Sequence, residues 1–354
     1  MNAAKSRVSS LDLLRVILSV MVIALHFCNS NGGGGFTYSK GNPAAYEFML
    51  LLKSVSICAV NCFMMLSGYF QVKSQKRTIR KPIFMMGAVV CYNALFYVID
   101  VFLGNPFSVS SLIRAALPIN YFAWLYCTVY LISPWINLCL VKLSKKEFRF
   151  MLTVMSVLFV VWPTVVGMYT GITGTTILGI STISASDHGA GYTLVQFVMG
   201  YLFGAYLQLH KTSLTARQCS AGYLVSCAVT FLLIHLSMAA IEYSSVFVVA
   251  SAFFLTAAFT KWELHLGSVC TALASQSFNV FLTHGLMHGL WERMPLAQLG
   301  ESGILQTALL TLWAVAAMYA ASLAISIVTS KLIQPVRTVA ARLLPMEYTV
   351  KEDL

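Results

Sequence analysis

The sequence has few charged residues. Only 10% of its 354 residues are Asp, Glu, Lys or Arg, whereas average soluble domains carry about 25%. Hydrophobic residues make up 58% of the chain. A soluble fold of this length would need more polar surface than these residues supply. The composition therefore excludes an ordinary soluble protein and predicts an integral membrane protein.

Other common signals are also missing. No pair among the nine Cys has the spacing of a zinc ribbon or a redox motif, so we expect neither a metal site nor a disulfide framework. The first apolar stretch lacks a small-residue cleavage site and carries Asp12 and Arg15, which favours a membrane helix over a cleaved signal peptide. The net charge of +11 comes without a basic face interleaved with aromatics, so no nucleic-acid partner is expected.

Apolar segments long enough to cross a bilayer recur along the chain, because a membrane core requires about 20 apolar residues per helix. They predict an all-α fold, a polytopic transmembrane bundle of about ten helices. We interpret residues 1–340 as one integral-membrane domain and residues 341–354 as a short cytoplasmic tail. The expected spans are 9–28, 47–70, 82–103, 120–141, 149–170, 191–209, 219–238, 243–260, 267–289 and 304–330.

The loop charges support this division. With these ten spans, eighteen Lys and Arg residues lie on the side of the N-terminus, and only Lys40, Arg114 and Arg293 lie on the other side. Cytoplasmic loops carry the excess of Lys and Arg. An even number of spans then places both termini in the cytoplasm. Arg15 and Lys53 remain inside expected helices.

Three ionisable residues occur in the segment 9–28, namely Asp12, Arg15 and His26. Eleven residues separate Arg15 from His26, so the two share a helix face and lie about 16 Å apart along the axis. Asp12 precedes Arg15 by three residues, a spacing that permits an ion pair. Arg15 is therefore expected near the cytoplasmic edge of the membrane and His26 in its outer half.

A second imidazole is expected at a similar depth, because His284 lies toward the outer end of the segment 267–289. Imidazole is well suited to move a proton near neutral pH. A base there could deprotonate a hydroxyl, and a cation at the inner edge could hold an anionic donor. Position alone leaves two alternatives open: His284 as an interfacial residue, and Arg15 as a topology anchor paired with Asp12.

The first segment resembles a known family. Ser9–Arg15, followed by His26, is similar to the signature of acyltransferase family 3, the integral-membrane acyltransferases of bacterial surface glycans. The run Asn61–Phe70 is similar to the aromatic, Ser-Gly, aromatic ending of the family's second helix.

Two later motifs follow in the same order. Trp124–Tyr126 together with Tyr130–Pro134 resembles the family's fourth helix, and Ser277–His284 resembles its late Ser-Phe-x-x-Tyr-Leu-x-His run. Phe281 stands where the family usually has Tyr, so a role of that hydroxyl is absent here or supplied elsewhere.

The resemblance implies a multi-pass enzyme of a bacterial cell membrane. It implies transfer of an acyl group, most often acetyl, from cytoplasmic acetyl-CoA or another acyl-CoA to a hydroxyl of a surface polysaccharide or lipid-linked glycan. On this reading His26 is the general base and His284 a second catalytic group. Arg15, oriented by Asp12, contacts the donor, and Asn61 and Ser67 are candidates for lining the donor path. No metal or bound cofactor is expected.

Two other classes compete with the enzyme. A membrane transporter or flippase also fits ten helices with intramembrane charges, although no paired halves are visible in the sequence. A membrane-embedded partner or sensor in a glycan-assembly complex is the third interpretation. The sequence specifies neither the acceptor, nor the acyl chain, nor the oligomeric state.

Overall fold

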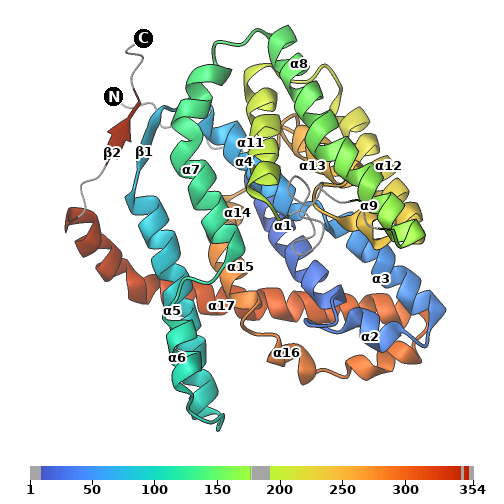
Figure 1. The fold of residues 1–354 in the computed structure, drawn as a ribbon. Helices are drawn as coiled ribbons and strands as arrows, with labels where there is room; N and C mark the ends of the chain where they lie inside the picture. The colour runs from blue at the N-terminus through green and yellow to red at the C-terminus, as the bar shows by residue number, and fades with distance from the viewer. Residues whose placement is uncertain (1–8, 176, 178–191, 344–346, 351–354) are drawn as a thin grey trace.

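The computed structural model describes residues 9–175, 177, 192–343 and 347–350, and nearly all of its ordered elements are helices (Figure 1). Two short strands are present, β1 (Lys76–Thr78) and β2 (Glu347–Thr349). The helices are α1 (Ser9–Cys28), α2 (Gly35–Ser39), α3 (Pro43–Ser56), α4 (Ala59–Gln71), α5 (Arg80–Phe102), α6 (Val109–Ala115), α7 (Tyr121–Leu140), α8 (Lys145–Ser156), α9 (Trp162–Thr173), α11 (Leu194–Leu209), α12 (Ala216–Ile234), α13 (Val246–Phe259), α14 (Ser268–Ser275), α15 (Ser277–His284), α16 (Gly289–Glu292) and α17 (Ile304–Leu343).

Within the described residues, eight helical stretches are long and apolar enough to cross a membrane. They are Ser9–Cys28, Pro43–Gln71, Arg80–Phe102, Tyr121–Leu140, Lys145–Thr173, Ala216–Ile234, Met238–Phe259 and Ile304–Lys331. The shorter apolar helix α11 falls in a ninth expected span. The predicted class, a polytopic helical membrane bundle, is confirmed. The number of crossings, the cytoplasmic termini and the domain boundary at residue 340 stay predictions.

The segment 267–289 differs from the single helix expected there. It is divided into α14 and α15, two helices of eight residues each, and then turns away after His284. Each piece is about 12 Å long, which is shorter than a bilayer core of about 30 Å. At the junction, the Gln276 amide oxygen accepts hydrogen bonds from Asn279 Nδ2 at 3.0 Å and Ser330 Oγ at 3.2 Å. These contacts tie the junction to α17.

Helix α1 lies at the centre of the bundle, where it contacts α3, α4, α13, α14, α15 and α17. In Figure 1 the long helix α17 crosses the lower part of the view, and α1 leads from it toward α4 and α14. Leu11, Leu14 and Leu18 of α1 are completely buried. The central place keeps the Arg, Asp and His side chains of α1 away from lipid, where polar groups are energetically costly.

Glycines allow α4 and α11 to cross at close range. A Cβ on Gly68 would lie 1.9 Å from the Tyr201 carbonyl oxygen, and one on Gly204 would lie 1.8 Å from the Met65 carbonyl oxygen. Both distances are far shorter than a van der Waals contact, so the two backbones approach as closely as only glycine permits. Small residues serve this purpose in membrane helix packing generally. The crossing fixes the end of α4 from which several site residues project.

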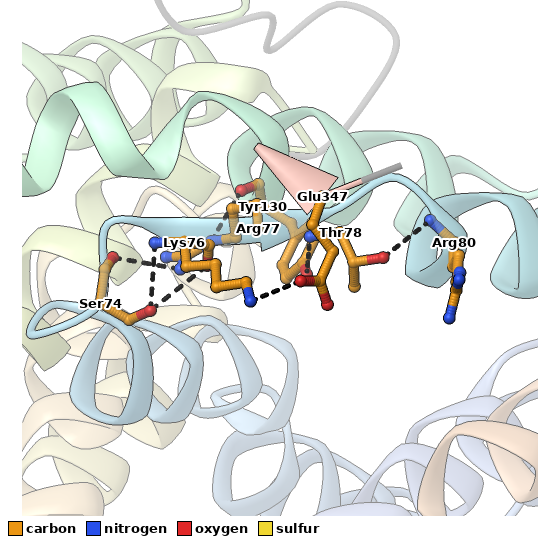
Figure 2. A network of polar contacts seen from close by, with 7 residues as sticks. All are labelled: Ser74, Lys76, Arg77, Thr78, Arg80, Tyr130 and Glu347. Atoms are coloured by element: carbon orange, nitrogen blue, oxygen red, sulfur yellow. Dashed lines mark hydrogen bonds and ion pairs between the residues drawn. The ribbon is translucent and has the colours of Figure 1, made fainter. Parts of the chain in front are cut away.

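A proline in α7 creates a binding site for the buried Arg77, whose contacts with Tyr130 and Ser74 are drawn in Figure 2. Pro134 has no N–H, so the carbonyl of Tyr130, one turn earlier, lacks its usual helical donor. Arg77 Nε donates to this carbonyl at 3.2 Å and to Ser133 Oγ at 2.9 Å. The guanidinium also donates to the Ser74 carbonyl at 3.1 Å. Arg77 thereby joins the turn after α4 to the middle of α7, although only 3% of it is exposed.

The described part of the tail pairs with the turn after α4 (Figure 2). β1 and β2 form an antiparallel two-stranded sheet in which Arg77 stands opposite Tyr348. Lys76 forms an ion pair with Glu347, and the Tyr348 hydroxyl donates to the Leu131 carbonyl. The Tyr348 ring also stacks on Trp135, with ring centres 5.6 Å apart. The tail is therefore attached to α7 beside the Arg77 contacts.

The close crossing of α4 and α11 leads to a test of the fold. Gly204→Ala would place a methyl group against the Met65 backbone, so we expect a loss of stability of about 1–3 kcal/mol, as overpacking generally causes. Gly87→Ala in α5 is the matched control, because a Cβ at Gly87 meets nothing within 4 Å. Thermal unfolding of the purified proteins in detergent measures both. Equal melting temperatures for the two variants would contradict the close approach.

Candidate active site

Arg15 is held by a neighbouring carboxylate on α1. Its Nη1 lies 2.8 Å from Asp12 Oδ1. The carboxylate is almost fully buried, and Thr271 Oγ1 of α14 also donates to it at 3.3 Å. The Arg15 side chain keeps 30% of its surface exposed and lies over the Phe70 ring, 4.8 Å from its centre. Asp12 therefore fixes one side of the guanidinium and leaves another side open to an adjoining cavity.

We name this space the Arg15 cavity; it has a volume of about 410 Å³. It lies between α1, α4, α5, α7, α14 and α15, and aromatic side chains form much of its wall. Near Arg15 its polar groups include Ser67, Gln71 and Ser275. Such a volume suits a small organic ligand, and an apolar wall with a few polar groups is typical of ligand sites.

A second cation lines the same cavity. Lys81, in the first turn of α5, donates from Nζ to the Tyr126 hydroxyl at 2.6 Å. Its ammonium also lies 4.7 Å from the centre of the Tyr130 ring. The sequence predicted Lys81 only as one of the loop charges that set topology. Its place in the Arg15 cavity depends on how α5 packs against α7, which no local motif reveals.

The outer part of α1 meets the second histidine. The ring centres of His26 and His284 are 4.8 Å apart in an edge-to-face arrangement. His288, just after the end of α15, lies 5.8 Å from His26. The structure therefore gathers His26, His284 and His288 into one cluster. Three imidazoles at this spacing can pass a proton between them.

One hydrogen bond indicates which ring nitrogen of His284 carries the proton. Its Nδ1 lies 3.2 Å from the Val280 carbonyl oxygen, which can only accept. Nδ1 then carries the proton, and Nε2 has a lone pair free to accept one. Nε2 is buried, and no described residue offers it a hydrogen bond. His284 is thus arranged as a neutral imidazole with a basic nitrogen that a substrate or its neighbour His26 could use.

Two further cavities meet at His26. The Lys53 cavity, about 410 Å³, is lined by His26, Lys53, Tyr192 and residues near Tyr243. The smaller His284 cavity, about 210 Å³, is lined by His26, His284 and Phe281 among others. His26 therefore faces both spaces.

Phe281 separates the Arg15 cavity from the histidines. It lines the Arg15 cavity on one side and the His284 cavity on the other. Its ring centre lies 5.0 Å from that of Phe122 and 5.7 Å from that of His284. The position that is Tyr in the family pattern is therefore an apolar partition in this chain. Phe281 is thus a residue common to the linings of the two cavities.

The two weaker sequence candidates lie in different places. Ser67 lines the Arg15 cavity, with its hydroxyl bonded to the Phe63 carbonyl at 3.1 Å. Asn61 is buried six residues earlier on α4, and its Nδ2 donates to the Tyr243 carbonyl at 2.9 Å. It therefore contacts the wall of the Lys53 cavity, whereas the sequence suggested the donor path. Asp187 and His188, which the sequence makes weak candidates for contact with a sugar, lie outside the described residues.

The comparison with protein families bears directly on this arrangement. The family model Acyl_transf_3, described as an acyltransferase domain, matches residues 8–331. The chain belongs to this acyltransferase family. Neither a curated protein nor a solved structure matches it. The resemblance inferred from the sequence motifs is thus confirmed, and the chain is a membrane acyltransferase.

The matched region of this acyltransferase contains both ends of the site. It begins just before α1 and ends at Lys331, so it includes Arg15, Lys81, His26 and His284. Acyl transfer requires a place for an activated donor and a base for the acceptor. A cationic cavity at one end and a histidine cluster at the other supply groups suited to each task.

Proposed function

We propose that this acyltransferase moves an acetyl group from acetyl-CoA to a hydroxyl of a bacterial surface polysaccharide or lipid-linked glycan at the plasma membrane. The observation that carries the proposal is the route along α1. It starts at Arg15 in a cationic cavity, passes the Phe281 partition and ends at the contact between His26 and His284. A donor and an acceptor can then meet at His26 from opposite ends.

The donor end suits a molecule with phosphate groups. Arg15 and Lys81 line one cavity and bring two positive charges to it. Arg binds phosphate through its planar fork, whereas Lys acts as a compact point charge. The apolar walls between them suit the uncharged part of the donor. Acetyl-CoA combines both features, with phosphates at one end and an acyl thioester at the other.

The length of the coenzyme A arm also matches the distance from Arg15 to His26. Arg15 and His26 are about 16 Å apart along α1. The pantetheine arm of coenzyme A has about 13 bonds between its sulfur and the first phosphorus. An extended chain advances about 1.2 Å per bond, so the arm reaches about 16 Å. A phosphate beside Arg15 therefore allows the thioester to reach His26 once Phe281 moves aside.

The reaction then needs one base and one returning proton. His26 accepts the proton of the acceptor hydroxyl, and the oxygen attacks the thioester carbonyl carbon. A C–O bond forms, the C–S bond breaks, and the sulfur leaves as the thiol after it receives the proton from His26. His284, with its ring centre 4.8 Å from that of His26, can share this proton during the transfer. No outside oxidant, reductant or metal ion is needed to balance the step.

The role of His26 can be tested by substitution. In His26→Gln the base is lost, so we expect transfer to fall at least about a hundredfold, the lower range for general base catalysis. The assay follows [14C]acetyl-CoA and the glycan in proteoliposomes without an ion gradient, which also separates an enzyme from a transporter. His265→Gln is the control, because His265 is exposed and lines none of the three cavities. Unchanged transfer in His26→Gln would remove His26 from the reaction.

The donor contact predicts a different kinetic change. Lys81→Met removes one charge from the cavity, so we expect the KM for acetyl-CoA to rise about tenfold, the usual loss for a hydrogen bond to a charged group. Lys73→Met, at an exposed lysine in the turn before β1, should leave this KM within twofold. Steady-state kinetics at saturating glycan measures both variants. An unchanged KM in Lys81→Met would exclude Lys81 from donor binding.

A further inference from the structure

The Lys53 cavity is separate from the space proposed for the donor. Its lining shares no residue with the Arg15 cavity, and it meets the reaction centre at His26. Its walls come from the end of α1, the last turn of α3 and the segment before α13. A second substrate in this cavity would reach His26 without crossing the donor path.

Lys53 is an unusual residue for this place, because it sits in one of the helical stretches apolar enough to cross a membrane. Its Nζ donates to Asn29 Oδ1 at 2.8 Å and lies 5.2 Å from the centre of the Phe36 ring. An ammonium has three donors, and among the described residues Lys53 Nζ uses one of them, in its hydrogen bond to Asn29. A charge kept in an apolar helix usually marks a functional site.

Tyrosines cover the opposite part of this cavity. The Tyr192 and Tyr243 rings both line it, with centres 4.2 Å apart, and their hydroxyls lie 2.6 Å from each other. Tyr121 packs on the far side of Tyr192, again at 4.2 Å. Aromatic rings with a polar edge offer an apolar face and hydrogen-bonding groups together. The ring of a sugar has the same combination, with C–H faces and a rim of hydroxyls.

The tyrosine wall is held rigidly from behind. Asn61 Nδ2 and Gln196 Nε2 both donate to the Tyr243 carbonyl, at 2.9 and 2.8 Å. Both amides are buried, and they come from α4 and α11, the helices joined by the close glycine crossing. The cavity wall therefore rests on the most tightly packed part of the bundle.

We propose that the Lys53 cavity binds the acceptor, as a hydroxyl-rich glycosyl unit, during acyl transfer. Lys53 donates a hydrogen bond to a hydroxyl beside the reacting one, and the Tyr192 and Tyr243 rings cover a face of the sugar. The reacting hydroxyl then points at His26. This proposal rests on the proposed function, since it names the acceptor site of the same reaction. It assigns Lys53 as a binding residue and Asn61 as a residue that positions Tyr243.

The test separates the two substrates kinetically. The acceptor probe is the glycolipid and polysaccharide fraction extracted from cells that lack this chain, titrated against the full-length protein with [14C]acetyl-CoA. In Lys53→Met we expect the KM for this fraction to rise at least about tenfold, while the KM for acetyl-CoA stays within twofold. Lys40→Met, at an exposed lysine that lines none of the cavities, is the control and should change neither value.

Each outcome of this experiment supports or overturns the proposed acceptor site. A Lys53→Met protein with an unchanged KM for the glycan fraction overturns the acceptor site. If Lys53→Met does not accumulate in the membrane, Tyr192→Leu carries the same test and must raise the same KM. Failure of the proposed function gives a different result, because the wild type itself would then transfer no acetyl group from acetyl-CoA.

Discussion

The structure depends on one constraint: ionisable groups on an apolar helix must not face lipid. An Arg in the middle of a membrane helix costs about 2.5–3.5 kcal/mol on insertion scales. Helix α1 carries Asp12, Arg15 and His26, and the fold surrounds it with other helices. Asp12 is buried against Arg15, and His26 packs on His284. The same requirement that centres α1 also places a cation and an imidazole along one internal stripe.

Two local features of the packing make the central position of α1 possible. The glycines at 68 and 204 bring α4 and α11 within backbone contact, which fixes Phe70 and Ser67 beside Arg15. Pro134 frees a carbonyl in α7, and Arg77 uses it to anchor the turn from which α5 and Lys81 begin. The elements that stabilise the bundle therefore also carry the residues of the cationic cavity.

The sequence could predict what is encoded locally. Segment length and composition were enough for the helical membrane class, and the eleven-residue spacing was enough to align Arg15 with His26. Contacts between segments that lie far apart along the chain could not be predicted from the sequence. The tyrosine wall joins residues 121, 192 and 243, and Lys81 shares a cavity with Arg15 only through the packing of α5 on α7. The break at Gln276 was also missed, and the contact of its side chain with Ser330, far along the chain, is another that no local pattern reveals.

The most direct test of the account is a structure of the protein with a non-hydrolysable acetyl-CoA thioether in a lipid nanodisc. The account predicts the phosphates between Arg15 and Lys81, a displaced Phe281 ring, and the acyl carbonyl carbon within about 5 Å of a His26 ring nitrogen, as proton transfer and attack at that carbon require. A ligand bound outside the Arg15 cavity, or an acyl group that ends on the Arg15 side of Phe281, would contradict it.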